Sequence, residues 1–247
     1  NHVVVEEFLT GPEVSVLSFC DGKTVKPMVS SMDHKRALDH DEGLNTGGMG
    51  TVAPNPYYTP AVAERCMQEI FLPTVAAMQA EGCPFKGCLY FGLMLTPDGP
   101  KVIEYNCRFG DPETQVVLPL LESDLLTVME ATTNGTLDKT DVKFSDGAAA
   151  CVILASGGYP LAYEKGKEIT GLTAGQLDAA DVTVYHAGTA IKDGRLVTNG
   201  GRVLGVTATA NTLPEALKKA YAATESIHFD KLHKRSDIGA RALAAMQ

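Results

Sequence analysis

The chain has 247 residues, of which 45% are hydrophobic and 21% charged, and its formal net charge is −9. These values are typical of a globular protein with a buried core, and the acidic balance argues against a nucleic-acid-binding surface. No signal peptide and no apolar run long enough to span a bilayer are found, so we expect a cytoplasmic protein with no membrane contact.

The cysteine pattern excludes a disulfide framework and a zinc finger. None of the cysteines has CxxC spacing, and no histidines pair with them at finger-like intervals. We therefore expect free thiols, including a structural role for the one beside the candidate site described below. The six are Cys20, Cys66, Cys83, Cys88, Cys107 and Cys151.

The N-terminal part predicts a meander of strands followed by a long loop. β-Branched or alternating residues predict strands over 3–5, 13–19 and 23–31. Residues 31–58 show no regular pattern, and a loop of this length is usually functional or disordered. Within it, the glycine-rich stretch Asn45–Gly50 can bring backbone N–H groups close to an anion, or it can be a flexible lid without contacts.

A helix is predicted next. Thr59 and Pro60 form an N-cap and first-turn pair, and the helical pattern runs to about Ala80 and stops at Gly82. Pro73 lies inside this segment, where its missing N–H predicts a kink.

Residues 87–106 predict a hairpin that carries the main chemical signal. Its second strand holds Glu104 and Asn106, which point the same way because side chains on a strand alternate between faces. A carboxylate and an amide oxygen side by side are ligands that Mg²⁺ accepts. Arg108 continues the period with a guanidinium suited to phosphate or carboxylate. The alternative is that these residues form the solvated face of the strand.

Helices are predicted after this hairpin. Asp111 and Pro112 are expected to open one helix as its N-cap and first residue, and a second helix spans Ser123 to Asn134. Metal ligands, an anion-binding fork and a helix N-terminus within eight residues together predict a nucleotide-phosphate site.

A polar, turn-rich stretch over 136–147 predicts a boundary between a domain at 1–140 and another at 146–247. Beyond it we expect a buried strand and then antiparallel strands, a helix opened by a capping box at Thr212, and a final helix. The predicted strands are 148–155, 182–191, 195–198 and 202–208, and the helices end near 226 and 246. His186, Arg202 and Arg235 stand out here without an assigned role.

Several ordered segments resemble the glycinamide ribonucleotide synthetase family of the ATP-grasp superfamily. They are VVVEEFLTGPEVS, DHKR, NTGGMG and VIEYNCRFGDPETQ in the first half, and GGYP, HAGT, TNGGRVL and RSDIGARAL in the last third. The resemblance covers essentially the whole chain. It implies an α+β fold: the C-terminal part of an ATP-grasp domain, with an antiparallel sheet and helices, followed by a small β-barrel-like or mixed α+β domain.

The resemblance also implies an activity. Members of this family join glycine to 5-phosphoribosylamine in purine synthesis, converting ATP to ADP and phosphate through a glycyl phosphate. Glu104 and Asn106 would hold Mg²⁺ or Mn²⁺, and Arg108 and Asp111 would be the catalytic residues. Glu6, Glu7, Phe8, Leu9 and Glu13 would bind the adenosine part of ATP. The substrate-binding residues would be Asp33, Lys35, Arg36, Asn45, Thr46, Gly47, Gly48 and Met49.

Two departures from the family pattern are visible. Tyr90 stands where many ATP-grasp enzymes carry a second metal carboxylate. The family's N-terminal part, with half of the nucleotide clamp, does not occur in this sequence, so we expect this chain alone to be inactive and to need that missing half as a partner.

Two rival functions remain open from the residues alone. One is another ATP-grasp ligase or carboxylase acting on a purine intermediate, which would need bicarbonate instead of glycine. The other is a non-catalytic interaction module, for which the grouping of Glu104, Asn106 and Arg108 would have no use.

Overall fold

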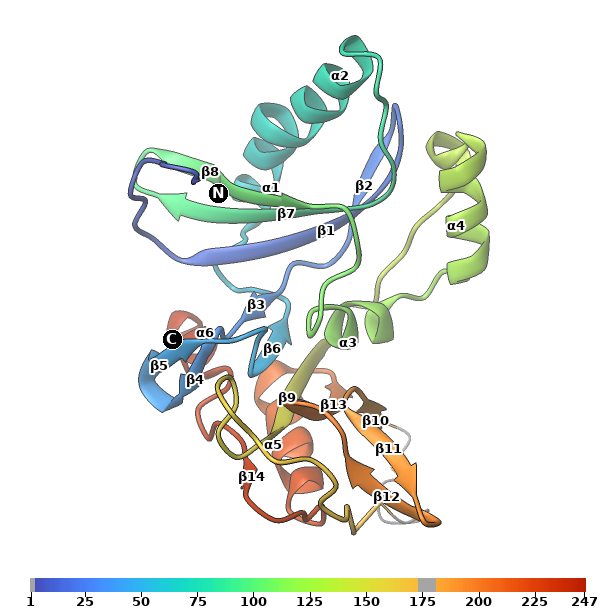
Figure 1. The fold of residues 1–247 in the computed structure, drawn as a ribbon. Helices are drawn as coiled ribbons and strands as arrows, with labels where there is room; N and C mark the ends of the chain where they lie inside the picture. Colours follow the sequence, from blue (N-terminus) through green and yellow to red (C-terminus); the bar gives the residue numbers. More distant parts are fainter. Residues whose placement is uncertain (1–2, 173–180) are drawn as a thin grey trace.

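The computed structural model describes residues 3–172 and 181–247. Over these residues two larger antiparallel sheets and two small hairpins combine with helices, which gives the expected α+β architecture (Figure 1).

The first sheet has the strand order β2-β1-β7-β8. Its strands are β1 (Glu13–Asp21), β2 (Val25–Pro27), β7 (Lys86–Thr96) and β8 (Gly99–Asn106). Alternation along β1 sends Val14 and Val16 to one face and Leu17 and Phe19 to the other, and each face joins a different hydrophobic cluster. The sheet is therefore covered on both sides.

One face of this sheet is covered by the helix predicted over 60–80. It consists of α1 (Pro60–Cys66), a single π-helical turn η2 (Met67–Phe71) and α2 (Leu72–Ala80). Thr59 Oγ1 accepts from the N–H of Val62 at 3.3 Å, as the predicted N-cap requires. The irregularity expected at Pro73 is present as the π turn just before it, and the helix ends at Glu81 and Gly82.

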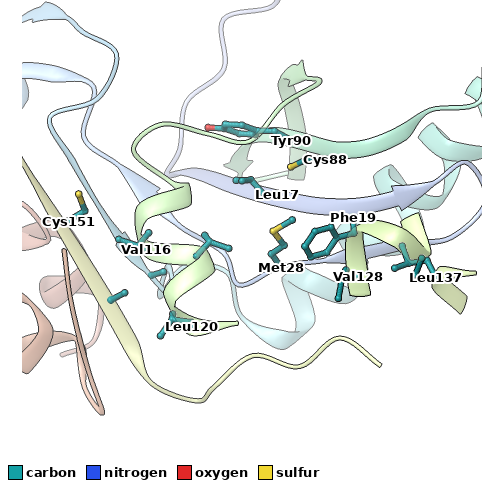
Figure 2. Close-up of a cluster of buried hydrophobic side chains, with 14 of the residues drawn as sticks. Leu17, Phe19, Met28, Cys88, Tyr90, Val116, Leu120, Val128, Leu137 and Cys151 are labelled. Atoms are coloured by element: carbon teal, nitrogen blue, oxygen red, sulfur yellow. The ribbon is translucent and has the colours of Figure 1, made fainter. Parts of the chain in front are cut away.

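The other face packs on α3 (Thr114–Val117), the 3₁₀ turn η3 (Leu118–Leu120) and α4 (Leu125–Asn134). Asp124 Oδ1 caps α4 by accepting from the N–H of Thr127 at 2.7 Å, which confirms the helix expected over 123–134. A 3₁₀ turn η4 (Leu137–Lys139) follows. Figure 2 shows Val116 and Leu120 between the strand that carries Leu17 and the strand that carries Cys151, and Val128 beside Phe19.

The second sheet is built around one fully buried strand, β9 (Ala148–Ser156). The order is β10-β13-β9-β6-β3, and β14 also pairs with β9. Helix α5 (Leu213–Thr224) covers one face and α3 the other. The remaining strands are β3 (Met32–Asp33), β6 (Gly50–Ala53), β10 (Val182–His186), β13 (Arg202–Ala210) and β14 (Leu232–His233).

Smaller elements complete the described chain. Strands β4 (Arg36–Leu38) and β5 (Glu42–Asn45) form one hairpin around the 3₁₀ turn η1 (Asp39–Asp41), and β11 (Thr189–Lys192) and β12 (Arg195–Thr198) form the other. The last helix is α6 (Ala240–Ala245). In the described residues the second sheet is open and does not close into a barrel.

The N-terminal strand prediction was wrong. Val3–Val5 forms no strand, and its side chains are exposed, because it makes no backbone hydrogen bonds to a strand in the described part of the chain.

The prediction that 31–58 is one irregular loop was also wrong, since it contains β3, β4, β5 and β6. Strand β6 pairs with β9 about a hundred positions later in the chain, so its local sequence carries no sign of its partner. Strands β3 and β6, from the first predicted domain, extend a sheet that is centred on β9, from the second. The division at 1–140 and 146–247 stays a prediction.

Three further predictions need correction. Residues 182–191 form two strands, β10 and β11, instead of one. Thr212 precedes α5, but its side chain makes no capping hydrogen bond. Asp111 does not cap a helix, because α3 begins only at Thr114 and the Asp111 carboxylate instead accepts from Gln115 Nε2 at 2.8 Å.

All six cysteines are free thiols. No helix in the described ranges combines the length and hydropathy needed to cross a membrane.

Candidate functional site

Strand β8 presents the side chains that the hairpin sequence singles out. Glu104 and Asn106 project to the same side, and Asn106 Nδ2 donates to Glu104 Oε1 at 3.2 Å. Arg108 follows the strand, and its Nη1 donates to the carbonyl of Phe109 at 2.9 Å. A carboxylate, an amide and a guanidinium therefore lie beside one another.

These groups face a cavity of about 160 Å³. Strand β8, the loop between β8 and α3, the glycine-rich loop and the segment after β3 all contribute walls. The lining residues are Asp33, Lys35, Thr46, Gly47, Tyr90, Glu104, Asn106, Arg108, Asp111 and Glu113. Four sequence-predicted residues from β8 and the following loop, Glu104, Asn106, Arg108 and Asp111, thus meet Asp33 and Lys35, although about seventy positions separate the two groups.

The backbone N–H groups of the glycine-rich loop already donate to other groups of the protein. The N–H of Gly47 donates to the Tyr159 hydroxyl at 2.9 Å, that of Gly48 to Thr46 Oγ1 at 2.9 Å, and that of Met49 to the carbonyl of His34 at 2.8 Å. These N–H groups are therefore not free to bind an anion in this conformation. Gly48 has φ +108, and a Cβ there would lie 2.5 Å from Pro112, so only glycine fits. The Met49 side chain is buried in the interior and lines no part of the cavity.

Two carboxyl groups form the floor of the cavity. Glu113 is only 4% exposed, and its Oε1 accepts from the Tyr90 hydroxyl at 2.8 Å. Because Tyr90 spends its one proton on Glu113, the contact of 2.7 Å between Tyr90 and Ser15 has the Ser15 hydroxyl as donor. Burial and the nearby Glu113 carboxylate raise the pKa of Asp33 well above its ordinary value. The tyrosine that departs from the family pattern therefore orients a buried carboxylate instead of supplying one.

A second cavity, of about 330 Å³, adjoins the first because both share Asp33 and Lys35. Its wall includes Arg36 and Asn45 from the hairpin β4–β5 and Arg241 from α6. Lys35 Nζ forms an ion pair with Glu13 at 2.6 Å. Burial lowers the pKa of Lys35, but the hydrogen bond and charge of Glu13 outweigh it, and the net pKa is raised. Lys35 therefore stays a cation between the two cavities.

The residues expected to bind adenosine lie at the other end of β8. Glu6, Glu7, Phe8 and Leu9 face Met94 and Lys101–Ile103 across a cavity of about 320 Å³. The Glu7 carboxylate pairs with Lys101 at 3.0 Å. The structure thus brings the N-terminal segment beside β8. Glu13 instead lines the adjoining cavity of about 330 Å³.

Arg202, from the start of β13, reaches across to the loops around the small cavity. Its guanidinium donates to the carbonyls of Gly47 and Asp111 at 2.6 and 2.8 Å, and it pairs with the Asp111 carboxylate at 3.0 Å. The predicted catalytic residue Asp111 is therefore engaged by an arginine from the C-terminal part of the chain.

Arg235 and His34 stabilise the region around the hairpin β4–β5 through hydrogen bonds. The Arg235 guanidinium is 1% exposed and donates to the carboxylates of Asp41 and Asp237 at 3.0 and 2.8 Å. Burial raises the pKa of Asp237, but hydrogen bonds from Arg235 and from the N–H of His40 hold it well below its ordinary value.

The His34 ring joins the same region to the C-terminus. Its Nδ1 contacts the carbonyl of Gly50 at 3.1 Å, and its Nε2 accepts from the N–H of Gly239 at 3.1 Å. A neutral ring with its proton on Nδ1 satisfies both bonds. Burial and the positive charges of Arg235 and Arg241 lower the pKa of His34 from 6.5 to about 4. His186, in contrast, is exposed at the end of β10 and contacts Thr189 Oγ1.

Comparison with known proteins agrees with this geometry. Residues 1–114 match the family model described as phosphoribosylglycinamide synthetase, ATP-grasp (A) domain, and residues 149–241 match the C domain of the same synthetase.

The chain belongs to the phosphoribosylglycinamide synthetase family.

This chain is similar to several curated proteins named phosphoribosylamine–glycine ligase. It is 51% identical to a phosphoribosylamine–glycine ligase of Synechocystis sp., over 98% of this chain and 58% of that protein. It is 50% identical to the enzyme of that name from Vibrio vulnificus, over 100% of this chain and 57% of that protein. The chain therefore spans little more than half the length of the curated relatives that it matches.

Solved structures support the fold. A phosphoribosylamine–glycine ligase from Thermotoga maritima superimposes with a TM-score of 0.84 at 39% identity, covering 94% of this chain and 57% of that one. A biotin carboxylase from Campylobacter jejuni superimposes with a TM-score of 0.66 at 13% identity, covering 93% of this chain and 48% of that one. The latter shows a shared fold only.

The sequence reasoning missed Glu113 and Tyr159, and it singled out Arg202 without assigning it a role. Glu113 follows Asp111 by two positions, and this proximity was the available signal. Arg202 and Tyr159 lie more than a hundred positions from the loop that they contact, and nothing in the local pattern links them to it.

Proposed function

We propose that this chain forms the C-terminal part of a cytoplasmic phosphoribosylamine–glycine ligase, which joins glycine to 5-phosphoribosylamine and converts ATP to ADP and phosphate. The observation that carries the proposal is the grouping of Glu104, Asn106 and Arg108 at one cavity, in a chain whose curated relatives bear that name. The ligase chemistry passes through a glycyl phosphate and needs no protein nucleophile. Its demands are positioning and charge neutralisation, which this group of residues can meet.

We assign each part of the substrates to one region of the site. The segment Glu6–Leu9 and Glu13 would hold the adenosine of ATP, so that the phosphates extend along β8 toward Arg108. The small cavity would hold the transferred phosphoryl group and glycine, and the adjoining cavity at Arg36 and Asn45 would hold 5-phosphoribosylamine. This division rests on the shared wall at Asp33 and Lys35, since the amine must reach the activated glycine.

Glu104 and Asn106 fit a divalent cation. Two neighbouring oxygens around an octahedral Mg²⁺ are about 3 Å apart. The terminal atoms of Glu104 and Asn106 are 3.2 Å apart and both line the cavity, and a flip of the Asn106 amide would present its oxygen in place of Nδ2. Among the described residues no three His, Cys, Asp or Glu side chains converge on one point. Mg²⁺ or Mn²⁺ held here would neutralise charge on the ATP phosphates.

Arg108 and Asp111 would divide the remaining work. The Arg108 guanidinium is directed to the cavity, where it would stabilise the negative charge of the γ-phosphate and of the acyl phosphate. Asp111 is tied to Arg202 and would fix the wall of the cavity beside that phosphate.

The test uses a chimera. It joins the N-terminal part of the Synechocystis ligase, up to the point where its likeness to this chain begins, to Asn1. We expect the chimera to release ADP only when both glycine and 5-phosphoribosylamine are present, and the present chain alone to release none, because half of the nucleotide clamp is then lacking.

Two results would contradict the proposal. ADP release that requires bicarbonate in place of glycine would identify a carboxylase-type ATP-grasp enzyme. A folded chimera that binds ATP identically with or without a Glu104→Gln substitution, and never turns it over, would favour a non-catalytic module.

A further inference from the structure

Arg202 lies in the C-terminal part of the chain and contacts two loops from the N-terminal part. It lies at the first position of β13, within the segment that matches the C domain. Its guanidinium contacts oxygens of Gly47 on one loop and of Asp111 on the other, at 2.6 to 3.0 Å. One planar group therefore holds both loops at once.

The two loops are opposite walls of the small cavity. Thr46 and Gly47 line it from one side, and Arg108, Asp111 and Glu113 line it from the other. The separation between these walls decides whether Arg108 faces the same point as Thr46 and Lys35. Arg202 bonds to both loops and Gly48 packs against Pro112, so the arginine and this packing together set that separation.

The contact is built for a guanidinium. A Cβ on Gly47 would lie 3.0 Å from Arg202 Cζ, so the loop approaches the arginine as closely as a glycine allows. Tyr159 provides a second tether from the same part of the chain by accepting from the N–H of Gly47. Nη1 donates to the carbonyls of both loops, and Nη2 adds the bond to the Asp111 carboxylate. The ammonium of lysine is shorter in reach and has one nitrogen, so it can keep only part of this set of bonds.

Arg202 also differs from a core ion pair. Its side chain is 19% exposed, and two of its acceptors are backbone carbonyls. Losing these bonds exposes the carbonyls to water at the cavity rim instead of stranding them in the interior, so the cost to folding is small.

We propose that Arg202 is a positioning residue, through which the C-terminal domain sets the distance between the glycine-rich loop and the loop that carries Arg108 and Asp111. This role rests on the proposed ligase activity of the same site. It makes the C-terminal domain part of the active-site geometry.

The kinetic test compares Arg202→Met and Arg202→Lys in the chimera with Arg195→Met, whose arginine is 68% exposed and, among the described residues, pairs with Glu168 alone. For Arg202→Met we expect kcat to fall about 10- to 100-fold, as misplacement of catalytic groups by about an ångström does. The KM for ATP should change less than about twofold, because the adenosine end is elsewhere. Arg202→Lys should keep an intermediate kcat, and guanidinium ions below denaturing concentrations should restore part of the activity of Arg202→Ala.

A second measurement decides the inference without requiring turnover. Hydrogen–deuterium exchange of the present chain should quicken at least about tenfold at the Gly47 and Gly48 amides in Arg202→Met, and remain unchanged at Val152 in β9. Arg195→Met should alter none of these amides.

The outcomes separate the two proposals. A wild-type chimera without ligase activity refutes the proposed function, while the exchange rates still test the positioning of the loop. Exchange at Gly47 and Gly48 that changes less than about twofold in Arg202→Met overturns the inference. So does an active chimera in which Arg202→Met matches Arg195→Met in kcat.

Discussion

Strands β8 and β9 belong to the two main sheets (Figure 1), and they differ in how far their side chains are buried. All nine residues of β9 are buried, and successive residues enter clusters on its two faces. Strand β8 lies at the edge of its sheet, and its last residues, including Glu104, are exposed or half-buried. The difference teaches that β9 holds the molecule together, whereas β8 presents polar groups to a ligand at little cost in stability.

The largest expected effect is on activity at β8. Glu104→Gln keeps the size of the side chain but removes the charge that would face the cation, so the chimera should lose about a thousandfold or more of its glycine-dependent ADP release. Its free energy of unfolding should change by less than about 0.5 kcal/mol, since the group is exposed.

Glu64→Gln, on the exposed surface of α1, is the matched control and should leave activity unchanged. A comparable loss of activity in both variants would show that the effect is not specific to β8.

The next effect is on stability at β9. Leu154 is 0% exposed, so Leu154→Ala should lower the free energy of unfolding of the chain by about 2–5 kcal/mol through lost burial and a residual cavity. Urea unfolding followed by circular dichroism measures this loss. Leu126→Ala, at a position on α4 that is 66% exposed, should cost less than about 1 kcal/mol. Equal losses in the two variants would show that β9 is not the scaffold.

A smaller effect depends on pH. The pKa of His34 is lowered from 6.5 to about 4 in the folded chain, so below pH 6.5 the unfolded chain binds a proton that the folded chain does not. Stability is therefore complete above pH 6.5 and falls as the pH drops from 6.5 to 4, by at most about 3 kcal/mol.

Urea unfolding of His34→Gln across this range should lack that part of the pH dependence. The exposed His186→Gln should retain it. Parallel stability curves for His34→Gln and the wild type would contradict the buried neutral ring.

The smallest effect concerns the floor of the cavity. Tyr90→Phe removes the hydroxyl that Glu113 accepts from, and should cost about 1–3 kcal/mol of stability. Phe91 is the neighbouring ring on the opposite face of the strand and has no hydroxyl to lose. Phe91→Tyr therefore tests whether a hydroxyl added on that face is tolerated. A Tyr90→Phe variant as stable as the wild type would show that Glu113 finds another donor.

Local patterns predicted much of the fold. Alternation identified β1, apolar runs on either side of a turn identified β7 and β8, and a buried apolar run identified β9. Thr59 marked a helix start through capping chemistry that acts within one turn. The same local rules placed Glu104 and Asn106 side by side, because strand geometry alone decides which way they point.

The rest depends on distant partners. Strands β3 and β6 form because β9 is present to pair with them, and Val3–Val5 forms no strand because no partner is present among the described residues. Glu113 gains its place from Tyr90, and Arg202 from Gly47, across long separations in the chain. Such contacts leave no periodic trace in the sequence.

The most direct test of the central claim is the position of the cation in an active chimera. Crystals grown with ADP and Mn²⁺ should show an anomalous peak within bonding distance of the Glu104 carboxylate and the Asn106 amide oxygen. A peak between Asp33 and Glu113 instead, or bound ADP whose Mn²⁺ contacts neither residue of β8, would contradict the account.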